Sequence, residues 1–279
     1  MRPSLAVALV RSRSDAQVHR QGSRLNLSLL PQIERIAAQA GDVILQVYGA
    51  AFAVRGKADA SPVTEADERA EALIVAALKA LTPDVPIVAE EAVARGAIPT
   101  IGSRFWLVDP LDGTREFVSR NGEFTVNIAL IEAGAPVLGV VLEPVAGRLY
   151  AGVVGQGAWV QDAAGRRAMA CRQVPPAAEQ GWVLACSRSH GDEAAMTAWL
   201  AGRPVSQRLA VGSSLKFGLI ANAQADVYPR LGRTMEWDTA AGDALLRAAG
   251  GSVTDLQGQA LRYGKPGFEN PHFVAWGRR

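Results

Sequence analysis

Apolar residues recur every three to four positions in two segments near the start of the chain, which is the spacing of one helix face. The first segment begins near Leu29 and ends at Gly49, and its apolar positions are Ile33, Ile36, Ala37, Ala40, Val43, Ile44 and Val47. The second opens at Thr64 and stops before Pro83. The pattern therefore predicts two amphipathic helices in the first third of the chain.

Short, nearly continuous apolar runs follow, and runs of this kind form strands of a sheet that is covered on both faces. In the first half they predict strands over residues 86–89, 105–109, 124–131, 137–142 and 149–154. Further on, strands are predicted over 182–186, 205–209, 226–228 and 252–254, with helices over 192–200, 214–222 and 237–249. The order predicts layered sheets and helices of the α+β or α/β class.

A polar stretch with Gly and Pro follows Gln161 and predicts a connection between two parts of the chain. We expect an α+β half over 28–161 that holds a metal site, and an α/β half over 170–279 that supplies substrate-binding elements, with a cleft between them. Residues 1–27 combine one short apolar run with a polar stretch, so we expect a disordered extension there. A weak targeting segment is the alternative.

Composition narrows the class of protein. Of 279 residues, 49% are hydrophobic and 20% charged, as in a globular domain rather than a disordered chain. No apolar stretch approaches the roughly 20 residues that span a bilayer, so no integral membrane segment is expected. Cys171 and Cys186 cannot form a disulfide framework. A cytoplasmic protein fits best, with peripheral association with the inner membrane and the choice between monomer and homodimer left open.

The positive charge is concentrated at the start of the chain. Residues 1–30 carry five Arg and one Asp, whereas the formal net charge of the whole chain is only +2. The remaining residues are therefore slightly acidic and give no sign of a surface that binds nucleic acid.

The strongest chemical signal is the segment FWLVDPLDGTREF at residues 105–117. An apolar strand delivers Asp109, and Asp112 follows three residues later. Two carboxylates so close together repel each other unless a cation lies between them. Gly113 and Thr114 then open a predicted short helix, whose free N–H groups suit an anion such as phosphate. As an alternative, Asp112 could be a turn residue of the Asp-Gly pair and Asp109 a cap. That would explain Asp-Gly alone, but not two acids directly after a buried strand.

Other acids are placed so that they could complete such a site. Glu90 and Glu91 end another predicted strand, and Asp238 lies near the start of a predicted helix. Each has a simpler structural explanation. Glu90 and Glu91 could be two solvated residues of a loop, and Asp238 could be placed at the helix start only because an acid is favourable there. Asp67 can likewise serve only as a cap for Thr64.

Together, the four pieces resemble the inositol monophosphatase superfamily of Mg²⁺-dependent, lithium-sensitive phosphatases. The resemblance to its bacterial 3′(2′),5′-bisphosphate nucleotidases lies in the blocks KADASPVTEAD, FWLVDPLDGTREFVSRNGEFTVNIALIEAG, SRSHGD, GSSLKFGLIANAQADVYPR and EWDTAAG. It covers the chain from about Leu29 onward. It implies a layered αβαβα sandwich, the sugar phosphatase fold, and hydrolysis of the 3′-phosphate of 3′-phosphoadenosine 5′-phosphate to AMP. One departure is the absence of the usual polar residue after the acidic pair, in EEAVARG.

Carried onto this sequence, the resemblance implies a site for two or three Mg²⁺ ions. Its ligands would be Glu90, Asp109, the backbone carbonyl of Leu111, Asp112 and Asp238. These are oxygen donors only, as hard cations prefer.

The resemblance also assigns roles in catalysis and in substrate binding. Asp67 and Thr114 match the pair that polarises the attacking water. The substrate would be bound by Glu90, Leu111, Asp112, Gly113, Thr114, Ser187, His190, Gly212, Lys216, Arg230 and Asp238. A flexible ammonium such as that of Lys216 suits a second phosphate. The alternatives are a solvated helix charge for Lys216 and a helix-capping surface residue for His190.

Three other functions compete with this one. An inositol 1-phosphatase or another sugar phosphatase of the same superfamily would use the same metal site. An aspartyl-phosphate phosphatase has a similar Asp-Gly-Thr segment, but its two acids stand two residues apart rather than three. A non-catalytic sensor that binds Mg²⁺ or a nucleotide would keep the fold without turnover.

Overall fold

The protein is described by a computed structural model over residues 5–56, 62–176, 180–188 and 192–279, with side chains described from residue 26 onward within these ranges. The first half contains α1 (Leu5–Tyr48), β1 (Val54–Gly56), β2 (Pro62–Thr64), α2 (Glu65–Leu81), β3 (Ile87–Ala89), α3 (Glu90–Ala94), β4 (Arg104–Asp112), α4 (Thr114–Val118), β5 (Thr125–Glu132), β6 (Ala135–Glu143), β7 (Arg148–Val153), β8 (Gly157–Asp162) and β9 (Gly165–Met169). The second contains β10 (Trp182–Ser187), α6 (Glu193–Leu200), β11 (Val205–Val211), α7 (Leu215–Ala221), β12 (Val227–Arg230), α8 (Glu236–Ala248), β13 (Ser252–Asp255), the 3₁₀ turn η1 (Pro266–Phe268) and β14 (Phe273–Trp276).

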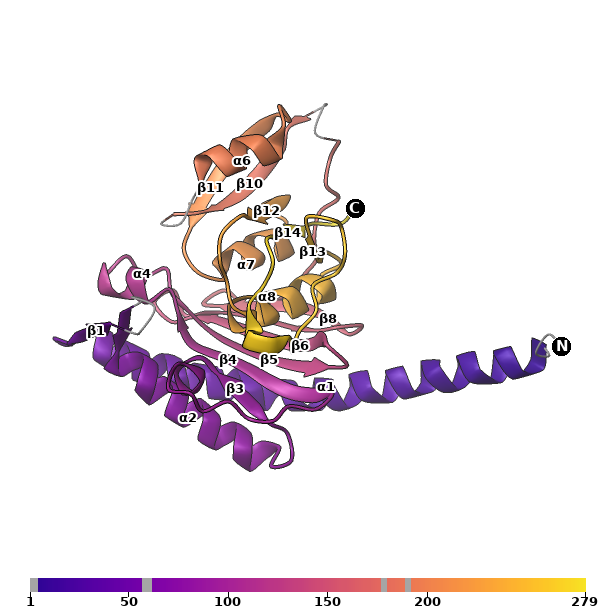
Figure 1. Ribbon diagram of the computed structural model, residues 1–279, viewed down its shortest axis with the longest axis horizontal. Helices are drawn as coiled ribbons and strands as arrows, with labels where there is room; N and C mark the ends of the chain where they lie inside the picture. Colours follow the sequence, from indigo (N-terminus) through magenta and orange to yellow (C-terminus); the bar gives the residue numbers. More distant parts are fainter. Residues whose placement is uncertain (1–4, 57–61, 177–179, 189–191) are drawn as a thin grey trace.

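These elements stack in five alternating layers (Figure 1). Helices α1 and α2 cover one face of a seven-stranded sheet of order β3-β4-β5-β6-β7-β8-β9. Helices α7 and α8 lie between that sheet and a five-stranded sheet of order β11-β10-β12-β14-β13. Helix α6 covers the outer face of the second sheet, where Leu200 packs with Trp182 and Val227. The αβαβα sandwich expected from the sequence is confirmed.

The seven-stranded sheet is antiparallel except at one edge, where β3 runs parallel to β4. Val108 and Ile128 on its neighbouring strands β4 and β5 are fully buried, because helices cover both faces. The parallel pairing matters for function, since β3 and β4 end at the same edge of the sheet. Ala89 at the end of β3 pairs with Val108 of β4, so the next residues, Glu90 and Asp109, are brought close together.

Helix α8 packs closely on the seven-stranded sheet because two glycines lie beneath it. A Cβ at Gly139 would be 2.3 Å from the carbonyl oxygen of Ala241, and one at Gly152 would be 2.9 Å from the Cα of Leu245. Neither distance is possible for real atoms, so the helix could not approach the sheet this closely over any other residue. The helix carries Asp238 in its first turn.

The start of α1 differs from the sequence-based expectation. The helix begins at Leu5 rather than near Leu29, so helical backbone occupies most of the segment expected as a disordered extension over 1–27. This segment lacks a regular apolar stripe, but its Ala, Leu, Arg and Gln residues favour helical backbone and it has no proline between Leu5 and Leu30. Figure 1 shows this part of α1 running beyond the sheet layers.

The boundary between the two halves also differs. Residues 165–169, expected within the connection, form β9 and pair with β8 as the edge of the first sheet. The second sheet contains β14 (Phe273–Trp276), which the sequence pattern did not single out. Among the described residues, none of the helices combines the length and the apolar character that crossing a membrane would need.

Candidate active site

The Asp109–Thr114 segment turns sharply at the end of β4. The pairing of β4 with β5 is interrupted between Asp109, opposite Asn127, and Asp112, opposite Thr125. Pro110 has no N–H for the ladder, and the N–H of Leu111 bonds instead to Asp109 Oδ1 at 3.0 Å. The turn thus keeps the two carboxylates close enough for the charge of Asp112 to act on Asp109, and the Leu111 carbonyl accepts a 3.4 Å contact from the Thr114 hydroxyl.

Gly113 makes the next step of the turn possible. Its φ of +92° lies in the left-handed region, and α4 begins directly after it at Thr114. A Cβ at this position would be 3.3 Å from both the Glu123 carbonyl oxygen and the Ser213 side chain.

Asp67 and Thr114 are in direct contact, as the sequence predicted for the pair that acts on water. Thr114 Oγ1 donates to Asp67 Oδ1 at 3.2 Å. The other carboxylate oxygen accepts the N–H of Thr64 at 2.8 Å and its hydroxyl at 2.7 Å. Asp67 therefore both caps α2 and contacts Thr114, so the cap does not exclude the role implied by the family resemblance, which stays a prediction.

Four carboxylates converge at this edge of the fold. Burial raises the pKa of Asp109 well above its usual value, and three neighbouring carboxylates raise it further. These neighbours are Glu90, Asp112 and Asp238. The pKa of Asp238 is raised in the same way, by burial first and then by Asp112 and Glu90. Asp238 thus lies close enough to the other carboxylates for their charges to act on it, and its role as a metal ligand stays a prediction.

The donor set fits a hard divalent cation. Buried carboxylates that repel each other are stabilised in their charged form when a cation lies between them, and each group here binds through oxygen. No three acidic, histidine or cysteine side chains in the described part of the chain enclose an ion by themselves. Mg²⁺ usually keeps several waters and binds through one or two carboxylates together with substrate phosphate.

Two polar residues that the sequence analysis missed hold Asp112. Ser214 Oγ lies 2.8 Å from Asp112 Oδ2 and also 2.8 Å from the Asp238 carbonyl oxygen. Asn127 Nδ2 donates to Ser214 Oγ at 2.8 Å. The available signal was a polar Asn in the buried strand run TVNIALI, because a buried amide needs partners.

A cleft of about 270 Å³ opens beside the carboxylates and is lined by acids and cations together. Glu90, Asp112 and Asp238 line it, as do Lys216 and Arg230. The predicted residues Gly113, Thr114 and Ser187 also line it, as do Arg115, Ser213 and Arg233, which the sequence analysis did not select. A cleft with both signs of charge suits an anion that is bound together with metal ions.

Lys216 is buried rather than solvated. Its side chain is held by the backbone carbonyls of Val211 and Ser213, and burial lowers its pKa to about 8. Burial also raises the pKa of Asp112, while the Lys216 charge and the Ser214 hydrogen bond act in the opposite direction. The alternative of a solvated helix charge is therefore wrong for Lys216.

The loop before α7 contains a second backbone feature of interest. Ser213 has a positive φ of 44°, and its buried hydroxyl has no hydrogen-bond partner among the described residues. A buried polar group without a partner carries a desolvation penalty, which a bound ligand in the cleft can relieve.

Gly212 and His190 are the predicted substrate residues with the least structural support. The N–H of Gly212 donates to Glu123 Oε2 at 2.8 Å, and a Cβ there would be 2.6 Å from the Glu123 carbonyl oxygen. Gly212 is thus needed for a close approach between the halves, which Arg188 strengthens through a two-point ion pair with Glu123. His190 lies outside the described residues.

Fold and site together define a metal-dependent phosphatase, and comparison with known proteins gives the family. Residues 27–276 match the model of the inositol monophosphatase family, and the chain belongs to this family. The match decides against the aspartyl-phosphate phosphatase alternative.

Within the family, the similarity to CysQ proteins is high. The chain is 46% identical to the 3′(2′),5′-bisphosphate nucleotidase CysQ of Escherichia coli K12, over 88% of this chain and 98% of that protein. The crystal structure of CysQ from Bacteroides thetaiotaomicron matches with a TM-score of 0.71 and 37% identity, covering 88% of this chain and 95% of that one. An inositol monophosphatase from Anabaena matches with the same TM-score at 25% identity, covering 90% and 91%.

Proposed function

We propose that this protein is a Mg²⁺-dependent 3′(2′),5′-bisphosphate nucleotidase that converts 3′-phosphoadenosine 5′-phosphate to AMP and phosphate. The observation that carries the proposal is the cleft in which the carboxylate cluster meets the buried ammonium of Lys216 and the guanidinium of Arg230. One set of groups suits metal ions at the reacting phosphate, and the other suits a second phosphate of the same substrate. The similarity to CysQ proteins over nearly the whole chain supports this choice.

The residues that would hold two or three Mg²⁺ ions are Glu90, Asp109, Leu111 through its carbonyl, Asp112 and Asp238. When bound, such ions neutralise charge on the transferring phosphate and its leaving oxygen, and lower the pKa of water. Ser214 and Asn127 keep the Asp112 carboxylate in one orientation through their hydrogen bonds. Residues that orient a metal ligand in this way commonly contribute a factor of about 10 to 100 to metal affinity or activity.

Asp67 and Thr114 provide a route for the proton of the attacking water. The Thr114 hydroxyl donates to Asp67 Oδ1, so its own lone pairs remain free to accept a hydrogen bond from water in the cleft. As the water attacks phosphorus, its proton moves to Thr114 Oγ1 while the Thr114 proton moves to the Asp67 carboxylate. The hydrogen bonds from Thr64 to the other oxygen of Asp67 hold that carboxylate in place.

The substrate would be recognised by its two phosphates. The 3′-phosphate would lie against the carboxylate-bound ions and the start of α4, near Gly113 and Thr114. The other phosphate would lie toward Lys216 and Arg230, with the orphaned Ser213 hydroxyl as a further donor. An inositol monophosphate carries no second phosphate for these cations to bind.

The decisive experiment is a comparison of phosphate release from 3′-phosphoadenosine 5′-phosphate and from inositol 1-phosphate at equal concentrations with Mg²⁺. We expect a clear preference for the nucleotide and inhibition by millimolar lithium, as the family resemblance implies. Lys216→Met provides a matched test, because it should weaken the preference while leaving hydrolysis of the monophosphate nearly unchanged. A preference for inositol 1-phosphate would overturn the substrate assignment, and no release from either compound would favour a non-catalytic sensor.

A further inference from the structure

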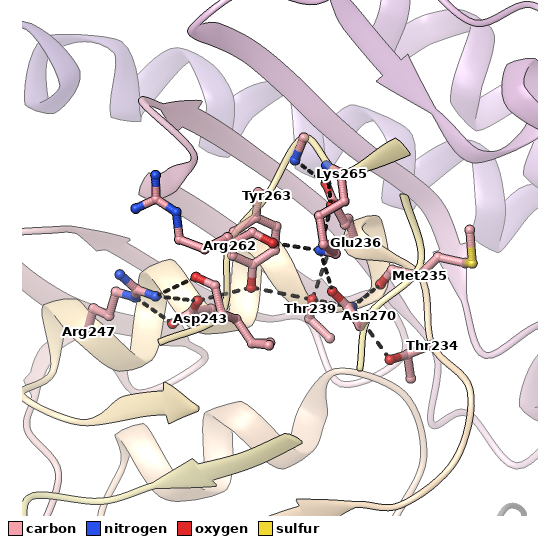
Figure 2. A network of polar contacts seen from close by, with 12 residues as sticks. Thr234, Met235, Glu236, Thr239, Asp243, Arg247, Arg262, Tyr263, Lys265 and Asn270 are labelled. Carbon is pink, nitrogen blue, oxygen red and sulfur yellow. Dashed lines mark hydrogen bonds and ion pairs between the residues drawn. The ribbon is translucent and has the colours of Figure 1, made fainter. Parts of the chain in front are cut away.

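A buried polar network joins the C-terminal segment 262–270 to the first turn of α8, which carries Asp238 (Figure 2). Glu236 is fully buried at the start of α8, and its carboxylate forms an ion pair with Lys265 Nζ at 2.6 Å. The same carboxylate accepts the backbone N–H groups of Gly264 at 2.6 Å and Lys265 at 2.9 Å. A segment about 30 residues further along the chain is thereby fastened to the helix start.

Asn270 contacts the residues on both sides of Asp238 in the chain. Its Nδ2 donates to the Met235 carbonyl oxygen at 2.7 Å and to Thr239 Oγ1 at 3.0 Å, which uses both amide hydrogens. Its backbone N–H donates to the Thr234 carbonyl oxygen at 2.9 Å. Lys265 Nζ lies 3.3 Å from the amide oxygen, which fixes the orientation of the amide group.

Met235 passes this constraint on to Asp238. The N–H of Met235 donates to Asp238 Oδ2 at 2.8 Å, and the N–H of Asp238 donates back to the Met235 carbonyl oxygen at 3.2 Å. The main chain of Met235 is thus held by Asn270 at its carbonyl and by Asp238 at its N–H. The two groups belong to adjacent peptide units joined at the Met235 Cα, so a shift of Met235 that lengthens the Asn270 bond also displaces the donor that orients the Asp238 carboxylate.

We propose that Asn270 is a positioning residue for the metal site: through the main chain of Met235 it sets the orientation of the Asp238 carboxylate. The inference rests on the proposed role of Asp238 as a metal ligand. Partners that orient a ligand typically contribute a factor of 10 to 100 in metal affinity. Because Asn270 acts through the main chain of Met235, we expect a loss near the lower end of that range.

The far part of the same network provides a control for simple destabilisation. Tyr263 donates its hydroxyl to Asp243 at 3.0 Å, and Asp243 is paired with Arg247, further along α8 than the first turn that carries Asp238. Tyr263→Phe removes this bond and a 3.4 Å contact with Thr239 Oγ1, while the bond from Asn270 to the Met235 carbonyl stays in place. It therefore tests whether any loss of stability in α8 is enough to weaken the metal site.

The experiment measures binding of Mn²⁺, a paramagnetic substitute for Mg²⁺, to the full chain by the electron paramagnetic resonance signal of the free ion. The variants are Asn270→Ser, Asn270→Leu, Tyr263→Phe and Asp238→Asn. Asn270→Leu keeps the volume of the side chain and serves if the serine variant does not fold. The Mg²⁺ concentration for half-maximal activity is measured alongside.

We expect both Asn270 variants to bind Mn²⁺ about 10-fold more weakly and to need about 10-fold more Mg²⁺, with kcat restored at saturating Mg²⁺. Tyr263→Phe should lower the melting temperature but keep the dissociation constant within about twofold. Equal Mn²⁺ affinity of the Asn270 variants and the parent would overturn the inference, as would a loss in Tyr263→Phe as large as theirs. If Asp238→Asn also binds Mn²⁺ normally, the proposed metal site itself is wrong, which separates the two failures.

Discussion

Replacing Asp109 with Asn should have opposite effects on activity and on the stability of the metal-free protein. The carboxylate of Asp109 is buried among three others, and its raised pKa shows that its charge is unfavourable there without a cation. Asparagine has the same shape and keeps an oxygen that can accept the N–H of Leu111. The substitution therefore removes mainly one negative charge.

The size of both effects can be worked out. Two like charges about 5 Å apart repel by roughly 3 kcal/mol at an effective dielectric constant of about 20. Removing Asp109 should thus raise the free energy of unfolding of the metal-free protein by about 1–3 kcal/mol at neutral pH. Below about pH 4 the gain should disappear, because the wild-type carboxyl is then protonated in both the folded and the unfolded state. The rate, in contrast, should fall about 10³-fold or more, or roughly 4 kcal/mol of transition-state stabilisation.

The assay combines phosphate release with urea unfolding in the presence of a chelator, at neutral and at acidic pH. Asp84→Asn serves as the matched control, because Asp84 is exposed and lies outside the cleft. Activity above about a tenth of the wild-type value would refute the role of Asp109. A metal-free variant that is less stable than the wild type at neutral pH would refute the electrostatic reasoning.

Three further predictions follow from the site. Thr114→Val should lower kcat by about 10²–10⁴-fold with Mn²⁺ affinity unchanged, because it removes the proton route and no proposed metal ligand side chain; weakened Mn²⁺ binding would contradict this. For the nucleotide, kcat/KM should fall as pH rises above about 8, where Lys216 loses its proton and its attraction for phosphate; Lys216→Met should abolish this limb of the pH profile, and an unchanged limb would assign it to another group. Gly212→Ala should raise KM at least several-fold, since a Cβ there would displace the loop from Glu123; a steady-state titration with the nucleotide checks this, and unchanged KM would show that the loop can shift freely.

Local sequence patterns were sufficient for those parts of the fold and site that depend on neighbours in the chain. The strand that contains Asp109, the helix start at Thr114 and the cap at Thr64 each follow from a few adjacent residues. The roles of the acids came from the family resemblance, since Asp67 and Asp238 alone are equally well explained as helix caps. The structure adds that they are caps and also face the site.

What the sequence could not give depends on contacts between distant segments. Ser214 and Asn127 are 87 positions apart in the chain, and only the meeting of α7 with β5 makes them partners. Lys216 follows a helix start like many surface lysines, and nothing local shows that it is buried. The early start of α1 at Leu5 was missed because helix propensity there is not accompanied by a regular apolar stripe.

Asp67 and Asp238 share a feature with a consequence for how this lineage can change. Each uses one carboxylate oxygen to bond a backbone N–H before its own helix, from Thr64 and from Met235. Replacing either acid with an apolar residue removes a helix cap, at a cost of about 1 kcal/mol, and would also remove its proposed role in the reaction. Drift toward an inactive homologue is therefore opposed at these two positions by the need to fold as well as by selection for turnover.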